Sequence, residues 1–240
     1  MTRLPLAALI AFGSLAALAA PVPKDRDSDL PPPTEKQLQA SRNNLLQIAI
    51  AIHSYHDAHG RMPNSVVDKG GKVALSWRVL ILPQLEEADL YEKFKLDEPW
   101  DSKTNKPLSE MMPKAFAPIR VKAKRGETFY RGFDGPDTVF EAGKKRMLAQ
   151  IPDGTSNTLM VVEAGEPCLW SKPDDLPYDA KKPLPKLGGL FDGDFHVLMG
   201  DGSVKLGHND KVDAAEFRKL ITCSDGMVVD SNKALGTAKK

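Results

Sequence analysis

The sequence lacks the residue patterns that mark several familiar classes of protein. It has only two cysteines in 240 residues and no Cys-x-x-Cys pair, so a cysteine-rich zinc site is not expected. His-Glu-x-x-His and Gly-x-Ser-x-Gly are also absent, which removes the usual signatures of zinc proteases and serine hydrolases. Basic and acidic residues, 33 and 32, nearly cancel, so no basic surface for nucleic acid is expected. What remains, with 41% apolar and 27% charged residues, is typical of a globular domain.

Long apolar runs are also missing. The longest, LPLAALIAFGSLAAL, falls short of the roughly 20 residues that a membrane span needs, and Pro21 and Pro23 follow it. A positive charge precedes this run, and Ala17 and Ala19 form the small-residue pattern that signal peptidase reads. Residues 1–19 are therefore predicted to be a signal peptide, with an uncleaved anchor as the alternative. A secreted or periplasmic protein without a stable membrane span after cleavage is expected.

The rest of the chain divides by composition. Residues 20–33 are rich in proline and in charges of both signs, which predicts an extended linker. One domain is predicted over residues 34–225, although two smaller cores would also fit the length. Residues 226–240 are predicted to be a flexible tail.

The folded region opens with a strong helix signal. Thr34 and Gln37 have the spacing of a capping box, and apolar residues then recur every three or four positions up to Tyr55. Gly60 is suited to end the helix. We therefore predict one long helix, buried on more than one side in its middle. Residues 76–94 predict a second helical region, interrupted at Pro83.

Short β-prone runs separated by glycine, proline and aspartate follow. The predicted strands are 127–133, 146–151, 158–164, 195–200 and 203–207, with a closing helix at 213–221. Asp201-Gly202 predicts a hairpin, because both residues tolerate positive φ. Helices first and strands later indicate an α+β fold, with a long N-terminal helix packed on an antiparallel sheet.

Several stretches together resemble a bacterial family, Domain of Unknown Function 1559. They are SRNNLLQIAIAIHSYHDAHGRMP, SWRVLILPQLEEADLYEKFKLDEPWDSKTNKPL, GPDTVF, IPDGTSNTLMVVEAGE, WSKPDDLPYDAKKPLPKLGG and VLMGDGSVKLG, in order over about residues 41–220. The resemblance implies a type IV pilin-like N-terminal helix and a pseudopilin-like fold. It implies no activity, because none is established for the family.

The sequence departs from the family pattern in three places. Gly13 is not followed by the aromatic residue and the glutamate of a pilin leader. Many members have a histidine ten residues before the Asp-Gly pair, where this chain has Phe191. The family's Cys-Pro pair is Ala117-Pro118 here. No role of that histidine or cysteine transfers to this chain.

Three of the five histidines lie at the end of the first predicted helix. His53, His56 and His59 are three residues apart, so the outer two lie roughly 120° apart around the helix. One metal ion could therefore take two of them but hardly all three. Helix-end packing is the preferred interpretation.

Other polar residues are candidates for sites. Asp192, Asp194 and Asp201 lie in turns that could hold Ca²⁺, although the EF-hand spacing is absent. Together with His53 and His56 they are weak metal candidates; no required metal, cofactor or catalytic residue is expected. The stretch PDGTSN is interpreted as a turn rather than a nucleophile loop. Glu163 and Glu166 are interpreted as solvent-facing residues. Cys168 and Cys223 could pair in an oxidising compartment.

Three functions remain in competition. The leading hypothesis is a non-enzymatic, extracytoplasmic structural or interaction domain, pseudopilin-like, whose partners are other envelope or secreted proteins or cell-surface glycans. The alternative is a glycan- or small-ligand-binding module that uses residues 170–189 and Trp170. The third is a metal-dependent hydrolase that uses His53, His56 and loop aspartates. Trp100 and Trp170 each neighbour proline and acidic residues and could form a carbohydrate-facing platform, but packing of loops onto the domain is the preferred interpretation of Trp77, Trp100 and Trp170.

The signal-peptide prediction is tested by the mass of the exported protein. Cleavage after Ala19 gives a mature chain that begins at Ala20, because cleavage one residue later would place Pro21 directly after the cut. N-terminal sequencing or intact mass of the exported protein checks this. A membrane-bound product that retains Met1 to Ala19 would contradict it.

Overall fold

The computed structural model describes residues 30–68 and 70–237. The predicted signal peptide, the predicted cleavage site and residues 20–29 of the predicted linker lie outside these residues.

The first helix, α1 (Glu35–His59), forms as predicted. Thr34 Oγ1 accepts a hydrogen bond from Gln37 N at 3.3 Å, and Gln37 Oε1 accepts one from Thr34 N at 2.9 Å, which completes the capping box. At the other end Gly60 has φ 66° and donates its N–H to His56 O, in a left-handed C-cap. The buried face of α1 consists of Ser41, Leu45, Ile48, Ala49, Ala51, Ile52 and Tyr55.

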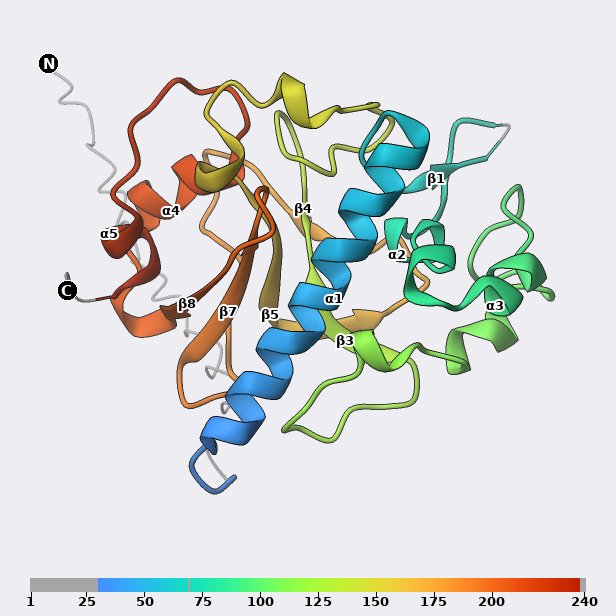
Figure 1. The fold of residues 1–240 in the computed structure, drawn as a ribbon, viewed down its shortest axis with the longest axis horizontal. Coiled ribbons are helices and arrows are strands. Elements are labelled where there is room, and N and C mark those ends of the chain that lie inside the picture. Colours follow the sequence, from blue (N-terminus) through green and yellow to red (C-terminus); the bar gives the residue numbers. More distant parts are fainter. Residues whose placement is uncertain (1–29, 69, 238–240) are drawn as a thin grey trace, which may run out of the picture.

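The helix lies across a four-stranded antiparallel sheet, which confirms the predicted α+β fold (Figure 1). The strand order is β3-β5-β7-β8, with bounds β3 (Glu127–Arg131), β5 (Leu159–Leu169), β7 (Asp194–Met199) and β8 (Val204–His208). Each strand pairs antiparallel with its neighbour. Only β7 and β8 are joined by a tight hairpin, while long segments that contain β4 and β6 connect the other strands; an antiparallel sheet of this kind can have one face covered by the helix that precedes it.

Side chains alternate across the sheet and divide the core in two. Val161 of β5 and Leu198 of β7 pack on the side of α1. Their neighbours Val162 and Val197 face a second cluster, built with the two C-terminal helices, α4 (Ala214–Ile221) and α5 (Ser231–Leu235). The period of two in a strand therefore produces three layers: α1, the sheet, and the pair α4 and α5.

A group of short elements lies beside α1, on the right of Figure 1. The predicted second helical region contains α2 (Trp77–Leu80), the 3₁₀ helix η1 (Pro83–Leu85) and α3 (Ala88–Lys93), so the predicted interruption at Pro83 is confirmed. The remaining strands are the antiparallel pair β1 (Val66–Val67) and β2 (Val73–Leu75) and the parallel pair β4 (Phe133–Asp134) and β6 (Leu176–Pro177). The other 3₁₀ helices are η2 (Lys106–Glu110), η3 (Lys114–Phe116), η4 (Leu148–Gln150), η5 (Thr155–Asn157) and η6 (Asn209–Lys211).

Two predicted segments differ from the structure. The strand predicted over 146–151 is the 3₁₀ helix η4, because its apolar residues Leu148 and Ile151 face the core three positions apart, the repeat of a 3₁₀ turn. The tail predicted over 226–240 contains α5, whose Ala234 and Leu235 are buried in the second core cluster. The Asp230 side chain caps this helix.

The hairpin predicted at Asp201-Gly202 joins β7 to β8. Gly202 alone of the pair has positive φ, 82°, while the Asp201 side chain accepts hydrogen bonds from Ser203 N and Ser203 Oγ at 2.9 and 2.7 Å. The turn therefore uses one left-handed residue and one Asx contact instead of two left-handed residues.

None of the helices in the described ranges has the length and apolarity to cross a membrane.

The packing of α1 predicts opposite results for two isoleucines two residues apart. Ile48 is fully buried, whereas Ile50 on the same helix is 66% exposed. We expect Ile48→Asp to lower the free energy of unfolding by about 4 kcal/mol or more, because the carboxylate is buried without a partner. Ile50→Asp should change it by less than about 1 kcal/mol. Urea unfolding of both variants measures the difference; similar midpoints would refute the assigned helix face.

Candidate functional site

A cluster of buried polar side chains lies between α1 and the sheet. Glu163 of β5 is fully buried, and its carboxyl group contacts three groups. Ser41 Oγ of α1 donates a hydrogen bond to Oε1; on β7, His196 N donates to Oε2 at 2.6 Å, and His196 Nδ1 lies 3.0 Å from the same oxygen. Tyr130 of β3 contacts Ser41 Oγ through its hydroxyl group at 2.7 Å. The carboxyl group thus joins β5 to α1 and β7, and Ser41 extends the cluster to β3.

The order of these contacts argues against nucleophilic catalysis. A hydrolase triad needs the histidine between the hydroxyl and the carboxylate, so that it can take the proton. Here Glu163 lies between Ser41 and His196. Burial, and next the charge of Glu163, raise the pKa of Tyr130 above its usual range, so its phenol stays protonated. The arrangement holds the helix to the sheet.

Sequence reasoning missed this cluster. Glu163 was predicted to face solvent, which is wrong; Glu166, predicted likewise, is exposed. The available signal was the position of Glu163 inside a strand whose residues from Leu159 to Gly165 are buried on both faces. A charged residue at that position contradicted the expected pattern, and only its partners from α1 and β7 explain it.

The three histidines of α1 have separate environments. His56 Nε2 accepts a hydrogen bond from Leu148 N at 3.3 Å, and the His59 ring stacks on Tyr55 with centroids 4.0 Å apart. His53 Nε2 is buried without a hydrogen-bond partner among the described residues, and it faces the turn at Gly202. All three rings therefore pack against local structure at the helix end.

The predicted metal candidates have other contacts. Asp194 Oδ1 lies 2.8 Å from His208 Nδ1, and Asp201 Oδ1 accepts the two Ser203 hydrogen bonds. Asp192 lies 3.3 Å from Arg120. Over residues 30–68 and 70–237, histidine, cysteine, aspartate and glutamate side chains form no group of three or more suited to a metal ion.

Cys168 and Cys223 are free, buried thiols rather than the disulfide considered from the sequence. Burial raises the pKa of both, that of Cys223 to about 12. A thiol is a nucleophile only as a thiolate, so neither is activated at neutral pH.

Residue Trp170 packs inside the domain, the preferred interpretation, and does not form the ligand platform of the alternative hypothesis. Its side chain is fully buried, its Nε1 donates to Ser109 O at 2.9 Å, and Phe116 stacks on it at 5.9 Å. Trp77 is buried as well, whereas Trp100 is half-buried with Lys172 Nζ 5.8 Å from its ring centre. The glycan-binding prediction therefore loses its named residue, while loop packing explains the tryptophans.

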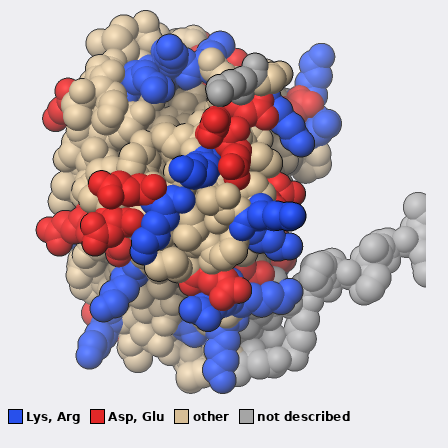
Figure 2. Space-filling model, turned by 90° about the vertical axis from the view of Figure 1, so that its right-hand side faces the viewer, with Lys and Arg blue, Asp and Glu red and all other residues tan. Residues whose placement is uncertain are grey.

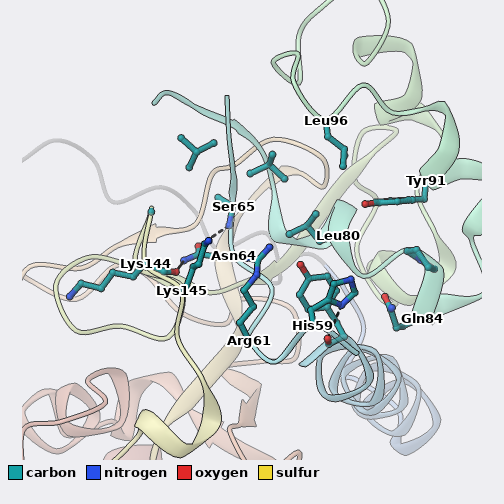
Figure 3. A pocket seen from close by; sticks show the side chains of 15 residues that line it. His59, Arg61, Asn64, Ser65, Leu80, Gln84, Tyr91, Leu96, Lys144 and Lys145 are labelled. Atoms are coloured by element: carbon teal, nitrogen blue, oxygen red, sulfur yellow. Dashed lines mark hydrogen bonds between the residues drawn. The ribbon is translucent and has the colours of Figure 1, made fainter. Parts of the chain in front are cut away.

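The structure instead shows a cavity that the sequence did not predict. It has a volume of about 650 Å³ and lies at the C-terminal end of α1, between that helix, β1, the α2–α3 segment and the loop of residues 143–145 (Figure 3). Ligand-binding cavities commonly have volumes of 300–1,000 Å³. The lining residues come from segments up to 90 positions apart, so no local pattern could show them.

One side of the cavity is cationic. Arg61 and Lys145 line it, and neither side chain has an ion pair or hydrogen bond among the described residues. Lys144 differs, because its Nζ pairs with Glu141 at 2.7 Å. The loop that carries both lysines is fixed by Asn64, whose Nδ2 donates to Glu141 O and Lys144 O, each at 2.6 Å. The cavity lining therefore contains two unpaired cations, Arg61 and Lys145, and hydrogen bonds from Asn64 hold the loop of Lys145 in place.

The other side is apolar and aromatic, with Leu80, Tyr91 and Leu96 facing the cavity (Figure 3). Leu80 ends α2, which is anchored from beneath by Arg78. The fully buried Arg78 guanidinium donates to Tyr130 O at 2.7 and 3.0 Å and pairs with Asp175 at 2.9 Å. The buried ion pair of Arg78 and Asp175 therefore holds in place the helix that carries Leu80.

The two sides influence each other at Tyr55. Burial raises the pKa of its phenol, the Arg61 guanidinium lowers it, and Tyr91 raises it. The net shift is upward, so the phenol stays neutral and can donate or accept a hydrogen bond. The face on the right of Figure 1 carries charges of both signs without a large area of one sign (Figure 2). The cationic groups of the cavity are therefore not part of a larger positively charged surface on this face.

Comparison with known families gave one match. Residues 39–122, about a third of the chain, are similar to the family described as "Protein of unknown function (DUF1559)". This confirms, over that segment, the resemblance inferred from the sequence. The matched segment contains α1 from Gln39 onward and the cavity walls up to Leu96, but not the loop of residues 143–145. Searches of curated proteins and of solved structures found no match.

The buried cluster predicts that Glu163→Gln destabilises the fold. An amide would place an N–H group or a weaker acceptor opposite donors from Ser41 and His196, at a cost of about 2–3 kcal/mol in the free energy of unfolding. Glu166→Gln, at an exposed position of the same strand, should cost less than about 0.5 kcal/mol. Urea unfolding compares them. Equal stability of the two variants would show that the Glu163 contacts contribute nothing.

Proposed function

We propose that this protein is a non-catalytic, extracytoplasmic binding domain, and that the cavity at the end of α1 is its recognition site. The cavity itself is the observation that carries the proposal: it combines a suitable volume with two unpaired cations and an apolar wall. Arg61 and Lys145 are suited to bind a ligand, because neither side chain forms an ion pair or hydrogen bond within the described part of the protein.

The distribution of reactive groups supports the non-catalytic part. Catalysis needs a nucleophile or a base within reach of a substrate. Ser41 and His196 each contact Glu163 beneath α1, and none of the three lines the cavity. The cavity lining contains neither a carboxylate nor a cysteine, and its histidine, His59, stacks on Tyr55 with Nδ1 2.9 Å from Tyr55 O and makes no hydrogen bond to the Ser65 hydroxyl among the described residues. Its arginine, lysines and tyrosines are suited to holding a molecule.

The predicted signal peptide and linker support the extracytoplasmic part. Together they describe a folded head delivered across a membrane and separated from its N-terminus by a proline-rich spacer.

A structural, pseudopilin-like role is the second candidate. It is supported by one observation, the long α1 packed along an antiparallel sheet. A subunit of that kind would need no cavity with unpaired cations. Ligand binding therefore separates the two candidates.

The test is binding without turnover. Mature protein in EDTA is screened against small extracellular metabolites and cell-wall fragments by thermal shift, and the bound compound is recovered and weighed by mass spectrometry. We expect at least one compound to raise the melting temperature by about 2 °C or more and to return unchanged. In Ser65→Trp, whose indole is introduced to obstruct the cavity from its wall, the shift should be lost. Chemical conversion of the compound, or a metal requirement, would contradict the proposal.

A further inference from the structure

We propose that the cavity binds a small organic carboxylate that carries an N–H donor and an apolar or aromatic body, the chemistry of an N-acylated amino acid or of a short peptide's free carboxyl end. This inference rests on the proposed function and specifies its ligand. Each of the three chemical features corresponds to one part of the cavity lining.

The carboxylate follows from Arg61 and Lys145. The Arg61 guanidinium offers paired donors whose geometry suits a carboxylate, and no described acidic side chain occupies them. Lys145 adds a second positive charge on the same side (Figure 3). Lys144 contributes little, since Glu141 already neutralises it at 2.7 Å. The cavity therefore offers about two positive charges, more than a neutral ligand would use.

The apolar body follows from Leu80, Tyr91 and Leu96. These side chains lie across the cavity from Arg61 in Figure 3, and the Tyr91 ring offers a flat face for stacking. A bare inorganic anion would leave this wall unused. An aliphatic or aromatic group attached close to the carboxylate would cover it.

The N–H donor follows from Gln84. Its Oε1 is buried and has no hydrogen-bond partner among the described residues, although nearly all buried polar atoms in proteins have one. Gln84 lines the cavity at the end where His59 and Tyr91 lie (Figure 3). Because an amide oxygen only accepts, the complementary ligand group is a donor, such as the N–H of an acylated amine.

The probe that carries all three features is N-acetylphenylalanine. Titration calorimetry on the mature protein should give a Kd at or below about 1 mM, in keeping with a ligand of this size. Its C-terminal amide, which lacks the charge, should bind about 10- to 100-fold more weakly, the usual contribution of a charge-assisted hydrogen bond. Inorganic phosphate, which lacks the apolar body, should also bind at least about 10-fold more weakly.

Matched variants assign the groups. Arg61→Gln should weaken binding of N-acetylphenylalanine about 10- to 100-fold. Lys145→Gln should weaken it more than Lys144→Gln, its neighbour with a paired charge. Gln84→Leu should weaken N-acetylphenylalanine but leave 3-phenylpropanoate, which has no N–H, unchanged. Arg61 is half-buried, and the two lysines are exposed, so melting temperatures close to wild type are expected and confirm folding.

Three results would overturn the inference: equal binding of the free acid and the amide, phosphate binding as tight as that of the organic acid, or equal losses in Lys144→Gln and Lys145→Gln. Failure of the broader proposal is distinguishable. If N-acetylphenylalanine does not bind but another screened compound does, and Ser65→Trp abolishes that binding, the binding function stands and this ligand class is wrong. If no compound binds, both are wrong.

Discussion

One buried carboxyl group decides how the long helix sits on the sheet. Burying Glu163 is costly unless its oxygens are satisfied, and the donors that satisfy it come from α1 and β7. Apolar packing alone is non-directional and would tolerate small rotations of the helix. The hydrogen bond from Ser41 is directional and would break if the helix rotated. Because Glu163 also accepts a hydrogen bond from His196 N, the same carboxyl group fixes both the rotation of α1 and the register of β7. Polar contacts in a core can contribute this kind of specificity at some expense of stability.

The position of the cavity depends on that docking. Tyr55 and His59 lie four to five turns further along α1 than Ser41, so a rotation of the helix at the cluster would move both cavity residues. The opposite wall has its own anchor, the buried pair of Arg78 and Asp175. The cavity is thus held between two buried polar contacts that do not line it, an arrangement in which distant residues keep a binding surface in place.

The elements that could be predicted from the sequence are those specified by local patterns. The capping box and Gly60 defined α1 to within a residue, and Pro83 marked the break in the second helical region. The strand at 146–151 was mispredicted because Leu148 and Ile151 are compatible with either a strand or a 3₁₀ turn. Helix α5 was missed because five residues carry too short a pattern.

The candidate site could not be predicted, since its residues are brought together by the tertiary fold. Arg61, Tyr91 and Lys145 come from three separate segments, and none belongs to a recognisable motif. The reactive-looking residues, such as the helix-end histidines and Trp170, drew attention by type or spacing but proved to pack within the structure. The unpaired charges of Arg61 and Lys145 identify the cavity as a candidate site, and a charge can be called unpaired only when the structure shows the partners of the other charged residues.

The length of α1 gives the molecule a direction. A helix of 25 residues spans about 37 Å, the chain enters it at Thr34, and the cavity lies beside its last turn. The start of α1 and the cavity therefore lie at opposite ends of the helix, so a contact made at the N-terminal end of α1 would leave the opening of the cavity uncovered.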